Sequence, residues 1–311
     1  MNTNKKPYLF IICYFILAII LTNFSYFSLQ QNVHNDENSK TDRAGNFISI
    51  SQNVNRIVSL APSVTQILMD FGLTENFIAT DTHSHQMFDL PDLPTFDMLH
   101  PEIESLISLQ PDLIIATTMT FHPQDLQQVI NTFANFNITL AFIPTSETIA
   151  DIIEDVRFLG SITGKYQISD NLIMDFEHEL DTIKNSLSNL KNSPQIYFEI
   201  SPAPHIFSFG TGVFLHEMIE LSGGENIFVD QIGWFAVEPE SLISRNPEII
   251  FTNAYFLANP VDEIKSRPGF SELNAVTNNR IYFIDHHQTN LPTLRILDGI
   301  RTMAEIILKG Q

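Results

Sequence analysis

Histidines placed just after predicted strands are the residues of this chain best suited to chemistry. They follow the apolar segments 77–79, 113–116, 196–200 and 281–284, and they are His83, His85, His122, His205, His286 and His287. Imidazole is the commonest protein ligand of transition metals, and it also coordinates the metal of a macrocycle axially. His83 and His85, separated by one residue, are the first candidates for metal ligands.

Each of these residues also has a plain structural explanation, because surface loops collect polar side chains of every kind. Trp234 and Phe235 pose the same alternative. In the predicted loop 231–237 they either stack on a flat ligand or anchor the loop to the protein surface. The number of strand ends that carry histidine favours a shared ligand site.

The elements that would position these side chains alternate between strand and helix. Apolar strands are predicted at 57–60, 77–79, 113–116, 140–143, 196–200, 249–251 and 281–284. The intervening sequence has helical periodicity, for example in 125–136 and 213–221. Ser63 with Gln66 fits a capping box at the start of the first helix. Apolar strands alternating with helices indicate an α/β fold with parallel sheets, in which ligands bind beside the carboxyl ends of the strands.

A repeated segment divides the chain into two similar lobes. Glu104-Ser105-Leu106-Ile107-Ser108 recurs as Glu240-Ser241-Leu242-Ile243-Ser244, and each copy precedes a proline and an apolar strand. Repetition of this kind indicates two units built from the same supersecondary elements. We therefore expect an N-terminal lobe at 47–145, a helical connection at 146–193 and a C-terminal lobe at 194–311.

Composition limits the function. The chain has 16 basic and 36 acidic residues, a net charge of −20, which disfavours binding to nucleic acid. Its only cysteine, Cys13, lies within an apolar run near the N-terminus. The remainder of the chain therefore offers no thiolate for a disulfide, a metal site or a nucleophile.

The N-terminus carries an export signal. Lys5 and Lys6 precede the apolar run 8–21, a pattern typical of a signal peptide and nearly long enough for a membrane span. We expect residues 1–28 to be a signal peptide or an N-terminal membrane anchor, and the polar segment 29–46 to be a flexible tether. Either alternative places the folded part outside the cytoplasm, in the periplasm or at the outer face of the cytoplasmic membrane.

Several segments together resemble a known family. They include Arg56-Ile57-Val58-Ser59-Leu60-Ala61-Pro62-Ser63, the stretch 106–116, Gly223-Gly224-Glu225-Asn226-Ile227-Phe228, Arg267-Pro268-Gly269-Phe270 and Arg280-Ile281-Tyr282-Phe283-Ile284-Asp285. In this order, they are similar to ABC-transporter substrate-binding proteins of the iron-siderophore and cobalamin class. The resemblance covers nearly everything after residue 54 and lies nearest the cobalamin-binding branch.

The resemblance implies two Rossmann-like lobes joined by a long helix, with a ligand cleft between them. It implies that Glu104 and Glu240 dock a monomeric binding protein onto arginines of the permease dimer. The alternative is that each glutamate only complements a helix dipole. Trp234, Phe235 and Arg295 join the histidines as candidate cleft residues.

One segment departs from the sequence pattern of the family, and this difference bears on which ligand, or cargo, the protein would carry. The family often carries Arg-Pro-x-Pro-Arg before its last helix, whereas this chain has Leu291-Pro292-Thr293-Leu294-Arg295. The missing arginine and the acidity of the chain disfavour an anionic catecholate. The expected cargo is a metal chelate, with cobalamin as the best candidate and haem, a ferric siderophore or a histidine-bound divalent metal as alternatives.

Two other classes of function compete with transport. A metal-dependent enzyme would need an open coordination site and a positioned base, but no His-Glu-x-x-His, nucleophile elbow or phosphate loop is found. A tethered sensor domain would need an output partner. We therefore expect a binding protein without catalytic residues or a catalytic cofactor.

Overall fold

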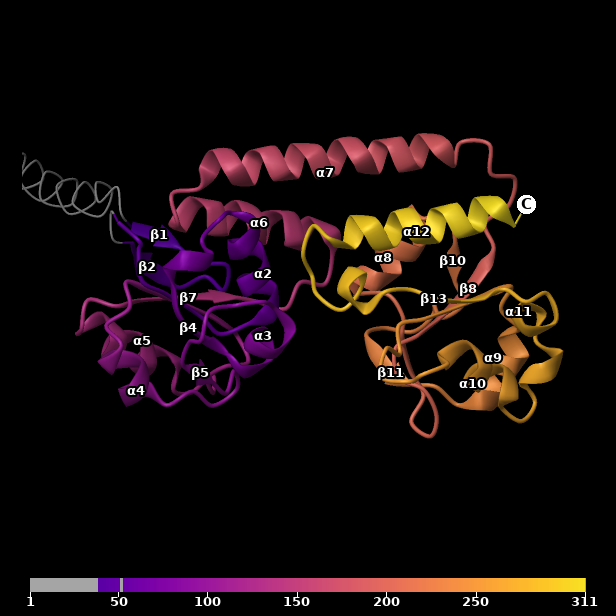
Figure 1. The fold of residues 1–311 in the computed structure, drawn as a ribbon, viewed down its shortest axis with the longest axis horizontal. Helices are drawn as coiled ribbons and strands as arrows, with labels where there is room; N and C mark the ends of the chain where they lie inside the picture. Colours follow the sequence, from indigo (N-terminus) through magenta and orange to yellow (C-terminus); the bar gives the residue numbers. More distant parts are fainter. Residues whose placement is uncertain (1–38, 51–52, 311) are drawn as a thin grey trace, which may run out of the picture. The chain divides into compact units, whose positions relative to one another are not determined.

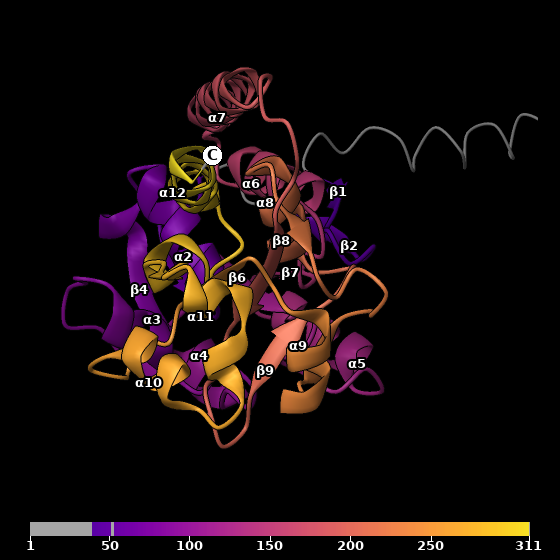
Figure 2. The same ribbon diagram turned by 90° about the vertical axis from the view of Figure 1, so that its right-hand side faces the viewer.

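The computed structural model describes residues 39–50 and 53–310 (Figures 1 and 2). Thr41–Gln311 forms one compact unit. The expected signal peptide or anchor, residues 1–28, lies outside the described residues. Within the described ranges, no helix has both the length and the apolar character needed to cross a membrane.

The N-terminal lobe is built on a five-stranded parallel sheet of order β5-β4-β3-β6-β7. Its strands are β3 (Ile57–Ser59), β4 (Phe77–Asp81), β5 (Thr95–Phe96), β6 (Leu113–Thr117) and β7 (Thr139–Ile143). The connections contain α2 (Pro62–Asp70), η1 (Thr74–Asn76), α3 (Thr82–Met87), α4 (Ile103–Ser108) and α5 (Leu126–Ala134). The three central strands, β4, β3 and β6, are almost wholly buried, as expected for a sheet with helices on both faces. Short strands β1 (Ser39–Thr41) and β2 (Phe47–Ser49) precede this lobe in the sequence.

The C-terminal lobe repeats the scheme with a four-stranded parallel sheet of order β10-β8-β12-β13. Its strands are β8 (Gln195–Glu199), β10 (Glu225–Asn226), β12 (Ile249–Thr252) and β13 (Ile281–Phe283). An antiparallel ribbon of β9 (Phe207–Phe209) and β11 (Trp234–Ala236) is inserted after β8. The helices are α8 (Phe214–Leu221), α9 (Pro239–Arg245), α10 (Pro260–Ser266), η2 (Phe270–Glu272), α11 (Asn274–Thr277), η3 (His286–Gln288) and α12 (Ile296–Lys309).

Two helices connect the lobes, α6 (Ile149–Ile162) and α7 (Tyr166–Ser186), and α7 packs against both α6 and α12 (Figure 1). Helix α6 contributes to two hydrophobic cores. Ile149 and Ile152 pack in the core of the C-terminal lobe, whereas Val156 and Leu159 pack in the core of the N-terminal lobe. Gly160 permits the close approach of α6 and α7, because a Cβ there would overlap the side chain of Ser169.

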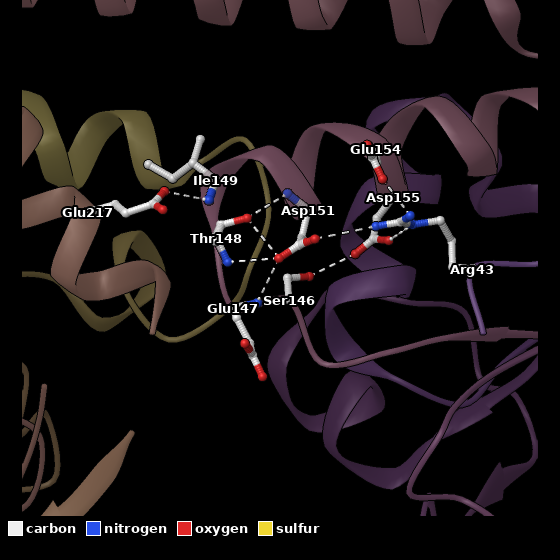
Figure 3. Close-up of polar contacts among 9 residues, drawn as sticks. All are labelled: Arg43, Ser146, Glu147, Thr148, Ile149, Asp151, Glu154, Asp155 and Glu217. Carbon is white, nitrogen blue, oxygen red and sulfur yellow. Dashed lines mark hydrogen bonds and ion pairs between the residues drawn. The ribbon is translucent and has the colours of Figure 1, made fainter. Parts of the chain in front are cut away.

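The start of α6 is fixed by polar contacts from both lobes (Figure 3). Thr148 and Asp151 form a reciprocal capping box, and Glu217 of α8 accepts a hydrogen bond from the backbone N–H of Ile149 at 2.7 Å. One turn further on, the buried carboxylate of Asp155 accepts bonds from Arg43 Nε and Ser146 Oγ, each at 2.7 Å. Two N–H groups of the first turn, those of Ile149 and Asp151, and the buried carboxylate of Asp155 therefore have hydrogen-bond partners.

Three expectations from the sequence need correction. The tether does not extend to residue 46, because Asp42 is buried and Arg43 pairs with Asp155. Ser63 does not cap α2, whose N-cap is Ala61 with Pro62 in the first turn. The segment 231–237 is not a simple loop, because its middle forms strand β11. The end of the tether could not be predicted from a local sequence pattern, because the partner of Arg43 is 112 residues away.

A buried ion pair crosses the C-terminal lobe. Arg267 donates two hydrogen bonds to Glu199, at 2.6 and 2.8 Å, and both side chains are buried. Glu263 accepts a further hydrogen bond from Arg267, and the hydroxyl of Tyr197 donates a hydrogen bond to Glu199. Burial raises the pKa of Glu199, and Arg267 opposes that shift. Arg267 therefore stabilises the charged form of the buried Glu199 carboxylate.

Replacing Arg267 by methionine (Arg267→Met) should lower the free energy of unfolding by about 3–5 kcal/mol at neutral pH, because Glu199 would be buried without its partner. The matched variant Arg301→Met breaks exposed ion pairs to Asp298 and Glu179 and should cost less than about 1 kcal/mol. Urea denaturation followed by circular dichroism measures both.

The decrease in the free energy of unfolding caused by Arg267→Met should become smaller as the pH falls. Without the arginine the pKa of Glu199 in the folded state rises further above its unfolded value, so the penalty grows with rising pH and disappears where the unfolded carboxyl is also protonated. An equal loss at neutral pH and near pH 5 would contradict an ionised Glu199.

Candidate functional site

The histidines selected from the sequence lie after the carboxyl ends of parallel strands. His83 and His85 follow β4, His122 follows β6, His205 follows β8, and His286 and His287 follow β13. In parallel α/β sheets this edge is where ligands bind. The structure differs from the prediction in how these residues are grouped.

A buried hydroxyl and carboxylate network lies after β4. Asp81 caps α3 by accepting a hydrogen bond from the backbone N–H of Ser84 at 2.9 Å. Thr65 Oγ1 lies 2.8 Å from Ser59 Oγ and 2.9 Å from Ser84 Oγ. All four side chains are buried, and they satisfy one another. This network fixes the start of α3 and is closed to a ligand.

His83 and His85 therefore lie on helix α3 rather than in a loop. Residues two apart on a helix point to different sides, so this geometry does not favour a shared metal ion. His83 is exposed, whereas Nδ1 of His85 is buried without a hydrogen-bond partner. The two side chains have different surroundings.

His122 lines a cavity of about 340 Å³ in the N-terminal lobe together with His100. The ring centroids of these two histidines are 6.5 Å apart. The walls come from the loop before α4, the turn after β6 and the side of α5, and include Ile103, Met119 and Val129. The structure thus places His100, which precedes α4, beside His122.

The C-terminal lobe presents an imidazole–aromatic cluster, which we define as Tyr255, Phe256, His286 and His287. Tyr255 stacks on His286 with ring centroids 3.9 Å apart and planes inclined by 17°. His287 lies 4.0 Å from His286, and Phe256 contacts Tyr255 edge-on at 5.6 Å. Tyr255 and Phe256 are 57% and 60% exposed. Four rings from two loops thus form one accessible surface.

Hydrogen bonds hold these two loops together. Asn253, directly after β12, donates to Thr289 Oγ1 at 3.0 Å and to Asn290 Oδ1 at 2.8 Å. Asp285 caps the 3₁₀ turn η3 by accepting a bond from the backbone N–H of His287 at 2.9 Å. Burial, and secondarily the electrostatic effect of the neighbouring His287, lowers the pKa of His286 below the ordinary value for histidine.

Trp234 and Phe235 lie on strand β11 and face opposite ways, as neighbours on a strand do. Phe235 packs edge-on against Phe228 at 5.1 Å beside a hydrophobic core, which supports the anchoring explanation for that residue. Trp234 contacts Phe209 and is 51% exposed, so its indole is accessible to a ligand. His205 is exposed in the turn between β8 and β9.

Arg295 has a partner in the other lobe. Its guanidinium donates to Asp70 at the end of α2, with 2.7 Å between Nη2 and Oδ1. The side chain that the sequence assigns to ligand binding is therefore engaged in an ion pair. The contact between Arg295 and Asp70 links the two lobes.

Glu104 and Glu240 occupy equivalent positions. Each is exposed in the first turn of a short helix, α4 or α9. Each helix leads to the strand that pairs with the first strand of its lobe, β6 beside β3 and β12 beside β8. The repeat therefore has the same topological place in both lobes.

Reasoning from the sequence missed Tyr255 and Phe256, and it did not group Asp285 with the histidines. The signal was present, because Tyr255-Phe256 follows a predicted strand and Asp285 adjoins His286. Asp285, His286 and His287 also form a possible metal-binding group. Within residues 39–50 and 53–310, they are the single group of three histidine, cysteine, aspartate or glutamate side chains whose ligand atoms all lie within 4.8 Å of one another.

Comparison with known proteins identifies the family. The model of the periplasmic binding protein family matches residues 57–287. The uncharacterized ABC transporter substrate-binding lipoprotein YvrC of Bacillus subtilis is 25% identical over 270 residues, 86% of this chain and 84% of that protein. A vitamin B12-binding protein of Vibrio cholerae is 27% identical over 261 residues, 82% of this chain and 90% of that protein.

Solved structures agree with this assignment. A possible iron-binding periplasmic solute-binding protein from Staphylococcus epidermidis superposes with a TM-score of 0.70 at 28% identity, covering 82% of this chain and 99% of the other. The vitamin B12-binding protein BtuF of Vibrio cholerae shares the fold, with a TM-score of 0.68 at 24% identity over 82% of this chain and 96% of its own. The chain therefore belongs to the periplasmic binding protein family, and its resemblance to ABC-transporter substrate-binding proteins of the iron-siderophore and cobalamin class is confirmed.

Proposed function

We propose that this protein is the extracytoplasmic substrate-binding protein of an ABC importer and that its cargo is a metal chelate, with cobalamin as the best candidate. It acts as a monomer, in the periplasm or anchored at the outer face of the cytoplasmic membrane, and delivers the cargo to a permease dimer. The observation that carries the proposal is an exposed aromatic surface at the carboxyl edge of the C-terminal sheet in a chain of this family.

The exposed aromatic residues suit a large, flat ligand. Tyr255, Phe256 and Trp234 each leave more than half of their surface in water. Aromatic rings gathered at a ligand-binding edge gain free energy when an apolar face covers them, and offset stacking adds about 0.5–1.5 kcal/mol per pair. The vitamin B12-binding relatives support a corrinoid as that ligand.

Titration of the purified protein with cyanocobalamin should give a dissociation constant of about 1 μM or lower, some −8 kcal/mol. Phe256→Ala should weaken binding about tenfold, because one stacking partner and its apolar area are removed. Isothermal titration calorimetry measures both constants.

The matched control is Phe136→Ala. Phe136 is equally exposed, at 58%, but it lies after α5 and before β7, at the amino end of the N-terminal sheet. Its removal should leave the affinity unchanged. Absence of heat with cyanocobalamin at two temperatures would reject the corrinoid, and the same titration with haem or a ferric siderophore would then test the alternative chelates.

The equivalent positions of Glu104 and Glu240 support docking to a two-fold permease. A helix dipole alone would favour glutamate in each first turn, but it would not require the same glutamate at the same topological place in both lobes. Charged groups at the rim of a transient interface mainly direct encounter and register. We assign these two carboxylates to contact with basic residues of the permease.

The double variant Glu104→Ala/Glu240→Ala should bind cargo normally and lose at least about 90% of transport, since both charged contacts to the permease are removed. Uptake of labelled cargo into proteoliposomes that contain the cognate permease measures the effect. The control pair is Glu75→Ala/Glu272→Ala, which removes one exposed first-turn glutamate from a 3₁₀ helix in each lobe. Normal uptake by the first pair would remove the docking assignment.

A further inference from the structure

We propose that Asp285, His286 and His287 form a binding site for a divalent transition-metal ion, held directly by the protein and distinct from the chelated metal of the cargo. The three residues are consecutive in the chain, and one 3₁₀ turn brings a ligand atom from each to within 4.8 Å of the others. The inference does not depend on the identity of the cargo, because the metal alone is the ligand.

The turn is held in shape before any metal binds. The capping bond from the His287 N–H to Asp285 Oδ1 fixes the carboxylate beside the two rings, and Nδ1 of His286 lies 3.4 Å from the same oxygen. Asp285 keeps its second carboxylate oxygen for a cation. The backbone of the turn therefore needs no rearrangement to bring the three groups together.

Neighbouring residues restrict the rings. Tyr255 stacks on one face of His286, and His287 lies at 4.0 Å, so the His286 imidazole has little rotational freedom. Asn253 attaches the loop of Tyr255 to Thr289 and Asn290, which follow the turn. Restriction of ligand orientation by surrounding partners typically contributes 10–100-fold to metal affinity.

The donor set defines the class of metal. Two imidazoles and one carboxylate suit Zn²⁺, Co²⁺, Ni²⁺ or Cu²⁺, whereas Ca²⁺ and Mg²⁺ prefer oxygen ligands alone. Three protein ligands leave coordination positions open, and Asp285 and His287 are exposed, so those positions face solvent. Water or a donor atom of a small molecule would complete the coordination shell.

Titration of the purified full chain with Co²⁺ in the visible range should show one bound ion with a dissociation constant of about 10 μM or lower. His286→Ala and His287→Ala should each weaken binding at least about tenfold, because a lost ligand costs no less than a lost outer-shell partner. Asp285→Asn should also weaken binding while its amide oxygen keeps the cap on the His287 N–H.

The control is the double variant His100→Ala/His122→Ala, which removes the other neighbouring histidine pair of the described structure and should bind Co²⁺ as the unchanged chain does. Circular dichroism of each variant checks that it is folded. Binding that survives in both His286→Ala and His287→Ala, or no Co²⁺ band with the unchanged chain, would overturn the proposal. Neither result would alter the outcome of the cyanocobalamin titration, which is carried out without added metal.

Discussion

Helix α6 is shared by the cores of both lobes, whose sheets carry the candidate site residues at their carboxyl ends. Its first turns carry Ile149 and Ile152 into one core, and its later turns carry Val156 and Leu159 into the other. An apolar stripe that is buried against two sheets cannot leave either one without exposing side chains to water, at about 25 cal/mol per Å². Its polar groups are satisfied from both sides, by Glu217 of the C-terminal lobe and by Arg43 next to the N-terminal lobe.

This connection leaves the carboxyl edges of the sheets free to hold side chains that the cores do not need. In the N-terminal lobe, the polar side chains after β4 are buried, and Asp81 and three hydroxyl groups form hydrogen bonds with the protein itself. In the C-terminal lobe it remains open, with exposed rings at Tyr255 and Phe256 and imidazoles at His286 and His287. The two lobes share a topology but differ in chemistry, which explains how one repeated scaffold can present an asymmetric surface to a ligand.

The sequence predicted the α/β class, the parallel strands and the repeated helices of Glu104 and Glu240, because those features have local signals of periodicity and punctuation. It did not predict the roles of Arg295 and Arg43. Their partners, Asp70 and Asp155, lie 225 and 112 residues away, and no local pattern carries such a pairing. The histidine pattern placed these residues after strands, where the structure also has them, but it did not predict their grouping. A helix after β4 separates His83 from His85, whereas a 3₁₀ turn after β13 gathers Asp285, His286 and His287.

The same contrast explains why metal chemistry is better placed in the C-terminal lobe than at His83 and His85. A helix directs residues two apart to different sides, so a metal between them would need the helix to unwind. A capped 3₁₀ turn already directs three donors to a common point, and the stacked Tyr255 restricts one of them. Preorganisation, rather than the number of histidines, decides which cluster can hold an ion, because ordering a loose side chain costs conformational entropy that the metal bonds must first offset.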